Sequence, residues 1–148
     1  MEINERTILL NNEEATRQYG LELASRLEAG DVVALIGDLG TGKTSLTKYI
    51  AQGLGVTEML SSPTFNIVKE YRSGRLPLFH FDVYRLGDAE ELLDIGGEEY
   101  FEAGGVCVIE WADIVMSVLP ENTIIVELEY TDKEDERSLT ERGMECWY

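Results

Sequence analysis

The sequence predicts an α/β fold of three layers built around a mixed, mostly parallel sheet. The stretch Gly-Asp-Leu-Gly-Thr-Gly-Lys-Thr at residues 37–44 matches the phosphate-binding pattern of glycine, four residues, glycine, lysine and serine or threonine. An apolar segment at residues 31–36, rich in β-branched side chains, precedes it, and a helical pattern at residues 44–54 follows it. Strand-like and helical segments then alternate along the chain, which indicates a P-loop NTPase-like arrangement.

Composition is typical of a soluble globular protein. With 148 residues, 44% of them hydrophobic and 28% charged, residues 1–148 are expected to form a single domain. The sequence has no apolar run long enough to cross a membrane and no signal-peptide pattern at its N-terminus, so we expect a cytoplasmic location. Cys107, in an apolar segment, and Cys146 form no metal-binding or redox motif, which suits a reducing compartment.

The formal net charge is −17. Binding to nucleic acid or to an anionic membrane needs lysine and arginine side chains, so neither is expected of this surface by itself. The acidity either faces a basic partner protein or only supports solubility.

The first elements precede the glycine-rich stretch. Residues 6–10 are predicted to form an edge strand. Asn11 and Asn12 can cap a helix that runs to about residue 29, where Gly30 fits a stop. The apolar stripe of this helix consists of Ala15, Tyr19, Leu21, Leu23, Ala24 and Leu27.

A hairpin is predicted after the glycine-rich stretch and its helix. Residues 53–62 read as a loop. Residues 66–72 and 76–84 follow as two strands that turn at Ser73 and Gly74. This pair makes the sheet mixed rather than wholly parallel.

The second half of the chain alternates again. Residues 88–95 are predicted to be a short helix broken by Gly96 and Gly97, with a further turn at residues 98–101. Residues 105–109 are a second buried strand, and residues 112–118 a weak helix.

The C-terminal part contains one clear element. Residues 123–130 alternate apolar and acidic side chains, as a half-exposed strand does, and residues 132–136 form a charged turn. The mixed segment 137–147 supports no firm prediction.

The glycine-rich stretch has the residues that a phosphate site requires. Gly37, Gly40 and Gly42 can take positive φ and bring backbone amides close to an anion. Lys43, expected to face solvent, adds a charge for the β- and γ-phosphates, and the Thr44 hydroxyl is placed to ligate Mg²⁺. The dipole of the following helix favours the same anion.

Two carboxylates are candidates for the acidic groups that nucleotide hydrolysis needs. Asp82 interrupts an aromatic and apolar strand, and Glu110 stands at the carboxyl end of a buried strand, where ligands bind in open α/β sheets. The alternatives are an ion pair of Asp82 with Arg72 or Arg85, and a plain surface position for Glu110. His80, two residues before Asp82, is expected to be structural or to line the site.

These stretches together resemble the TsaE family, the small bacterial ATPases of tRNA adenosine threonylcarbamoylation. The resemblance extends to about Val126 and is carried by residues 37–44, Ser62-Pro-Thr-Phe, His80-Phe-Asp-Val-Tyr-Arg and Ile109-Glu-Trp. It implies that Thr44 and Glu110 contact Mg²⁺, that Asp82 has a Walker B-like role, and that Thr64 lies near the γ-phosphate. With Lys43, Asp82 and Glu110 as catalytic residues, the residues expected to bind nucleotide are Gly37, Asp38, Leu39, Gly40, Thr41, Gly42, Lys43, Thr44, Ser45, Thr64, Trp111 and Arg137.

The resemblance further implies Mg²⁺-dependent hydrolysis of ATP in a complex with the proteins TsaD and TsaB, which modify adenosine 37 of tRNAs. Contact with tRNA would then be indirect, through the complex, and no membrane would be involved. Slow turnover by the isolated protein is expected, because no arginine finger is evident. A small-molecule kinase and a nucleotide-gated regulatory protein are the alternatives, and no guanine-reading Asn-Lys-x-Asp motif is present.

Overall fold

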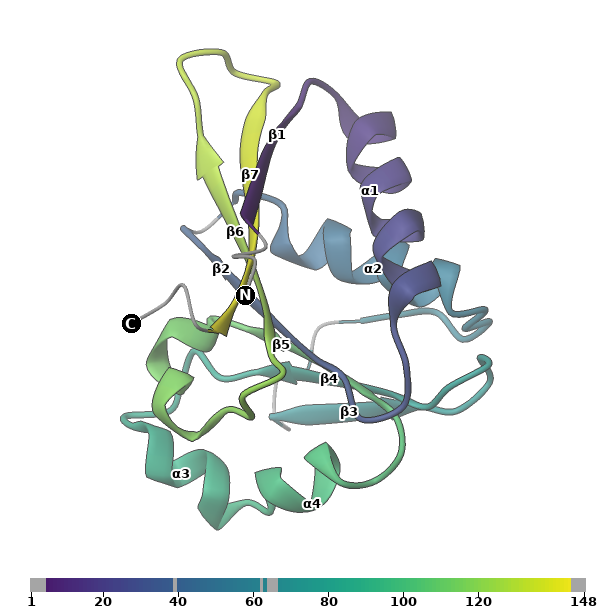
Figure 1. The fold of residues 1–148 in the computed structure, drawn as a ribbon, viewed down its shortest axis with the longest axis vertical. Coiled ribbons are helices and arrows are strands. Elements are labelled where there is room, and N and C mark those ends of the chain that lie inside the picture. The colour runs from purple at the N-terminus through teal and green to yellow at the C-terminus, as the bar shows by residue number, and fades with distance from the viewer. Residues whose placement is uncertain (1–4, 39, 62, 64–66, 145–148) are drawn as a thin grey trace.

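The computed structural model describes residues 5–38, 40–61, 63 and 67–144 (Figure 1). Within them, seven strands form one sheet in the order β1-β7-β6-β2-β5-β4-β3. The strands are β1 (Glu5–Leu10), β2 (Val32–Gly37), β3 (Val68–Tyr71), β4 (Leu78–Asp82), β5 (Val106–Glu110), β6 (Ile124–Tyr130) and β7 (Arg137–Gly143). The helices are α1 (Glu13–Arg26), α2 (Lys43–Gly53), α3 (Ala89–Asp94) and α4 (Gly97–Phe101).

The centre of the sheet is parallel and its edges are antiparallel. Strands β6, β2, β5 and β4 run parallel to one another, whereas β7, β1 and β3 pair antiparallel with their neighbours. Strand β2 lies in the middle because its apolar run is buried on both faces, as central parallel strands require. The phosphate loop therefore begins at the carboxyl edge of the sheet's centre.

Helices cover both faces of the sheet, which confirms the predicted three layers (Figure 1). One core lies between the sheet and helices α1 and α2, and a second lies between the sheet and α3, α4 and the segment after β5. Successive strand residues alternate between these cores. On β4, Leu78 belongs to the first core, and Phe79 and Phe81 belong to the second.

Helix α1 begins as predicted but ends earlier. The Asn12 side chain accepts a hydrogen bond from the Ala15 amide (2.9 Å) and caps the helix. The helix stops at Arg26, three residues before the predicted end, because Leu27 takes an extended conformation while its side chain stays buried. The Arg75 guanidinium donates to the carbonyls of Ala24 (2.6 Å) and Leu27 (2.9 Å), which satisfies the helix end.

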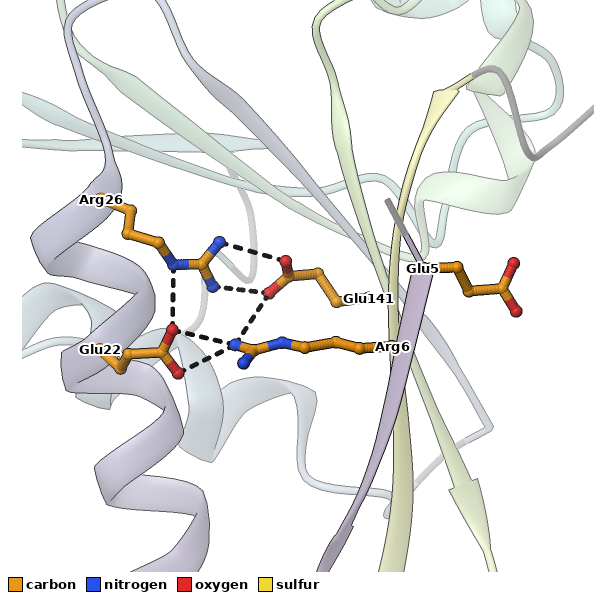
Figure 2. A pocket seen from close by; sticks show the side chains of 5 residues that line it. All are labelled: Glu5, Arg6, Glu22, Arg26 and Glu141. Atoms are coloured by element: carbon orange, nitrogen blue, oxygen red, sulfur yellow. Dashed lines mark hydrogen bonds and ion pairs between the residues drawn. The ribbon is translucent and has the colours of Figure 1, made fainter. Parts of the chain in front are cut away.

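Strand β7, within the segment left undecided by the sequence, lies between β1 and β6. Only Leu139 of this strand is fully buried, so the sequence lacks the alternation of apolar and polar residues that would predict a strand here. Its Glu141 joins Arg6, Arg26 and Glu22 in a charged cluster against α1, while Glu5 points away from the cluster (Figure 2). Ion pairs between β7 and its neighbours, rather than the burial of apolar side chains, hold this strand in position.

The remaining elements follow the predictions with small changes. The hairpin β3–β4 forms with shorter strands, the last pair being Tyr71 and Leu78. The weak helix is replaced by two short 3₁₀ turns, Ala112–Ile114 and Met116–Val118. Cys107 is buried, which raises the pKa of its thiol to about 12, and Cys146 lies outside the described residues. Among the described helices, none has the length and apolar character needed to span a bilayer.

Candidate nucleotide-binding site

The phosphate loop joins β2 to α2 at the sheet's carboxyl edge. Gly40 and Gly42 take φ values of 82° and 105°, which glycine alone adopts without strain. A Cβ at Gly40 would lie 2.7 Å from the Tyr130 hydroxyl oxygen, so the Tyr130 side chain would have to shift in addition to the backbone strain. Gly42 is the N-cap of α2 and has no side chain to cap it, so the first amides of the helix remain available for an anion.

The sequence predicted that Lys43 faces solvent, and the structure shows that prediction to be wrong. It is 5% exposed, and its Nζ donates to the carbonyls of Gly37 (2.5 Å) and Asp38 (3.0 Å). The same ammonium lies 4.0 Å from the centre of the Trp111 ring, a cation–π distance. Burial lowers the pKa of Lys43, and the carboxylate of Glu110 opposes that shift. The side chain thus folds over its own loop.

Thr44 and Glu110 meet although they are 66 residues apart. The Thr44 hydroxyl, in the first turn of α2, donates to Oε1 of Glu110 at the end of β5 (2.9 Å). Nε2 of His80 lies 2.5 Å from Oε2 of the same carboxylate. Glu110 is 3% exposed, so it is not the plain surface acid that was the alternative. The sheet brings these three groups together because β4 and β5 are parallel neighbours that end at the loop.

Asp82 lies beside this cluster. It is the register partner of Glu110 across β4 and β5 and is half-buried. Its Oδ1 accepts a hydrogen bond from the Tyr84 amide (3.0 Å). Arg72 pairs with Glu70 instead, and among the described residues no ion pair to Asp82 is formed. The carboxylate is therefore free of the structural ion pair that the sequence left open.

Trp111, directly after Glu110, has a strained backbone. Its φ is 63°, the only positive value for a non-glycine residue within the described ranges. Such residues cluster at functional sites, where the surroundings hold them in place. Its ring contacts Tyr84 at 4.8 Å between centroids, and Lys43 covers it as described. No sequence pattern predicted this stack, although Tyr84 lies two residues after Asp82.

Among the residues that the structure describes, two cavities border the loop. One of about 440 Å³ adjoins Gly40–Gly42, and its wall includes Ser45 of α2, Asn12 and Arg137. Nη1 of Arg137 donates to the carbonyls of Glu134 (2.8 Å) and Glu136 (2.9 Å), and its guanidinium covers the Tyr130 ring.

The second cavity, of about 420 Å³, has an acidic wall that consists in part of Asp38, Asp113, Glu127 and Glu129. The first cavity also has carboxylates in its wall, from Glu13, Glu134 and Asp135, but of the two it is the one that adjoins Gly40–Gly42 and includes an arginine, Arg137.

The donor atoms of the site fit Mg²⁺. A threonine hydroxyl and a glutamate carboxylate in contact offer oxygen ligands only, which this ion prefers. Across the described parts of the chain, no group of three or more His, Cys, Asp or Glu side chains could hold a metal alone. Mg²⁺ is usually bound through one or two carboxylates together with substrate phosphates and water.

Most of the predicted site residues therefore come together. Gly37, Asp38, Gly40, Thr41, Gly42, Lys43, Thr44 and Ser45 form the loop and helix start, with Asp82, Glu110, Trp111 and Arg137 around them. The Thr41 hydroxyl donates to the Asp38 carbonyl (2.7 Å), so it braces the loop. Leu39 and Thr64 lie outside the described residues. The direct contact of His80 with Glu110 was not foreseen.

Comparisons with known proteins agree on one family. The family described as "Threonylcarbamoyl adenosine biosynthesis protein TsaE" matches residues 10–139. A protein of Bacillus subtilis (strain 168) named tRNA threonylcarbamoyladenosine biosynthesis protein TsaE is 45% identical over 129 residues, covering 87% of this chain and 80% of the relative. A Treponema pallidum (strain Nichols) protein of the same name is 47% identical over 113 residues, covering 76% and 83%. The crystal structure of Bacillus subtilis YdiB superposes with a TM-score of 0.83 at 36% identity, covering 100% of this chain and 91% of that one.

Proposed function

The chain belongs to the TsaE family of threonylcarbamoyl adenosine biosynthesis proteins, and we propose that it supports tRNA threonylcarbamoyladenosine formation as a Mg²⁺-dependent ATPase. The pathway comes from the names of the family and of its similar members. We propose in addition that the protein hydrolyses ATP, that it uses Mg²⁺, and that it acts with the partner proteins TsaD and TsaB.

The observation that carries the proposal is the contact between Thr44 and Glu110 (2.9 Å) beside the phosphate loop. A glycine-rich loop alone would bind phosphate. A hydroxyl from the helix start joined to a buried carboxylate from the neighbouring strand adds two oxygen ligands at the phosphate end. Lys43 has the Trp111 ring and two loop carbonyls as partners, and phosphate oxygens can replace those carbonyls.

The residues divide the work as follows in this proposal. The amides of the loop and of the first turn of α2 bind the phosphates, and Lys43 neutralises their charge. Thr44 and Glu110 hold Mg²⁺, which when bound neutralises charge that develops on the phosphates. Asp82, which forms no ion pair with an arginine among the described residues, orients the attacking water. The 440 Å³ cavity beside Gly40–Gly42, with Arg137 in its wall, accepts the nucleoside end.

The test is phosphate release from ATP by the wild-type protein and by Glu110→Gln. The substitution keeps the shape of the side chain and removes its charge, so ATP binding should persist and Mg²⁺-dependent hydrolysis should fall about 100-fold or more. Glu127→Gln is the matched control, because Glu127 lies in the wall of the acidic cavity and pairs with Arg142.

Three results would contradict the proposal. Unchanged hydrolysis in Glu110→Gln would remove Glu110 from the site. Phosphate transfer to an added small-molecule acceptor would indicate a kinase, and tight ATP binding with no hydrolysis in the presence of TsaD and TsaB would indicate a nucleotide-gated regulator.

A further inference from the structure

His80 is a polar residue in a position that packing would fill with an apolar one. It lies in the middle of β4 with an exposed fraction of 0%. Leu78, two residues earlier on the same face, is equally buried in the core under α1 and α2. The register partner of His80 on β5 is Val108, which belongs to the same core. Among the described residues, the neighbours of His80 on this face of β4 and β5 are therefore apolar, whereas its register partner on β3 is Lys69.

The imidazole is also incompletely satisfied. Its Nδ1 is buried and has no hydrogen-bond partner among the residues that the structure describes. An unpaired buried polar atom destabilises a fold, and an apolar side chain of similar size would avoid that cost. Among the described contacts, the polar contact that accounts for a histidine here is that of its Nε2 with Glu110 Oε2 (2.5 Å).

That contact completes a chain of three side chains from three elements. A carboxylate only accepts hydrogen bonds, so Nε2–H of His80 on β4 donates to Oε2, while the hydroxyl of Thr44 on α2 donates to Oε1. Both oxygens of Glu110 are therefore held, each from a different side. Among the described contacts, these two are all that fix the carboxylate.

We propose that His80 is a positioning residue that holds the Glu110 carboxylate in the orientation in which it acts on the Mg²⁺–nucleotide complex. This rests on the proposed function. In that function the Thr44 oxygen would ligate the metal while its O–H can still donate to Oε1, and His80 supplies the restraint on the other carboxylate oxygen, Oε2. Hydrogen bonds from a second residue to a ligating carboxylate commonly tune metal affinity in this way.

Three substitutions separate positioning from packing. Gln places an amide N–H about as far from the backbone as Nε2, so His80→Gln can still reach Glu110. In His80→Asn the amide stops near the position of Nδ1 and cannot reach it, although it is equally polar. His80→Leu copies its neighbour Leu78 and keeps the core apolar. The Gln and Asn variants are thus a matched pair that differs in reach alone.

The measurement is the dissociation constant of ADP in Mg²⁺ and in EDTA, whose ratio gives the gain in affinity that the metal supplies. No turnover is involved. We expect the gain to fall about 10-fold in His80→Asn and His80→Leu and to stay near the wild-type value in His80→Gln. The constant in EDTA should be the same in all four proteins, because the loop amides bind phosphate without Glu110.

If Mg²⁺ increased the affinity for ADP by the same factor in all four proteins, the inference would be overturned, since His80 would then be structural. Parallel losses in EDTA and in Mg²⁺ would overturn it too, because they indicate a general disturbance of the loop. If His80→Leu fails to fold, the Gln and Asn pair alone decides. A wild-type protein with no metal-dependent gain would instead contradict the Mg²⁺ site of the proposed function, and the inference would fall with it.

Discussion

At the residue scale, Lys43 and Trp111 restrain each other. The ammonium is buried between the ring and two backbone carbonyls, so its charge is balanced by dipoles and by the ring's π-face rather than by water. Trp111 is held at positive φ with its ring under that ammonium and against Tyr84. A phosphate anion would compete for Lys43, and any movement of Lys43 would change the surroundings of the indole.

Lys43→Ala should raise the dissociation constant of ATP about 10- to 100-fold, since it removes a charge-assisted contact to phosphate. It should also lower the free energy of unfolding by about 1 kcal/mol, because the buried contacts to the Gly37 and Asp38 carbonyls are lost. Isothermal titration calorimetry and urea unfolding measure the two quantities. Lys48→Ala is the control, since Lys48 is exposed on the same helix. Equal ATP affinity in a folded Lys43→Ala protein would refute the role of Lys43.

Trp111 fluorescence should change when ATP and Mg²⁺ bind. The physical reason is that Lys43, 4.0 Å from the ring centre, moves from the indole towards phosphate oxygens and alters the local field. The experiment uses Trp147→Phe, so that Trp111 is the one remaining tryptophan. An emission spectrum that stays unchanged at saturating nucleotide would place Trp111 away from the events of binding.

At the scale of elements, the edge formed by β1 and β7 depends on charge. Glu141 accepts hydrogen bonds from the Tyr19 hydroxyl (2.5 Å) and from Arg26 (2.7 and 3.1 Å), and it pairs with Arg6 (Figure 2). Burial raises the pKa of Glu141, whereas the hydrogen bonds from Arg26 and Tyr19 lower it. The lowering outweighs the raising, so the pKa of Glu141 is below its ordinary value. Burial also raises the pKa of Tyr19, which keeps its hydroxyl a donor. The strand is thus tied to α1 by an ionised carboxylate.

Glu141→Gln should reduce the free energy of unfolding at pH 7 by roughly 1–3 kcal/mol, the range for hydrogen bonds to a charged group in a partly buried site. Because the pKa of Glu141 is lower in the folded state, its contribution is complete above the ordinary pKa of glutamate and is lost as pH falls through the lowered value. The difference between variant and wild type should therefore shrink in acid. Urea unfolding between pH 7 and pH 3 measures it.

Glu14→Gln is the control for this edge, because Glu14 forms an exposed pair with Arg17 three residues along the same helix. Its effect should stay below about 0.5 kcal/mol. Equal effects of the two substitutions, or a Glu141→Gln effect that does not depend on pH, would show that the cluster does not stabilise the edge.

At the scale of the whole molecule, the net charge of −17 constrains how the protein can serve tRNA modification. The segment from residue 88 to 102, which includes α3 and α4, has seven carboxylates and no lysine or arginine. Such a surface repels the phosphates of RNA, since affinity for a nucleic acid depends on basic side chains that displace its counterions. We therefore predict that contact with tRNA is made by a partner protein.

The isolated protein should not bind tRNA at physiological salt, and it should associate with TsaD and TsaB in a nucleotide-dependent way, with faster phosphate release in the complex. A partner can supply both RNA contacts and a further cation to the site, and an arginine finger contributes about 10³–10⁵-fold in related reactions. Gel filtration with ATP, with ADP and with neither, alongside phosphate release, tests the association. Tight tRNA binding by the protein alone, or no association in any nucleotide state, would contradict this prediction.

The sequence by itself determined what depends on neighbouring residues. The strand, glycine loop and helix around Lys43 were readable because their signals lie within a short stretch, and so were the Asn12 cap, the hairpin and the half-exposed strand β6. The positions of Thr44 and Glu110 in the site were predicted as well. They rest on a rule about strand ends and on the resemblance to TsaE rather than on any visible contact.

The tertiary structure alone decided what depends on residues far apart in the chain. Strand β7 has one fully buried residue and is placed by its neighbours β1 and β6 and by the charges facing Glu141. Helix α1 ends where Arg75 reaches its carbonyls. Lys43 is buried because its ammonium packs against the Trp111 ring. His80 contacts Glu110 because β4 and β5 are parallel neighbours in the sheet. Sequence patterns and residue propensities describe local conformational preference. Each of these contacts instead depends on burial and on hydrogen-bond or ion pairing between distant residues, which exist only once the sheet has formed.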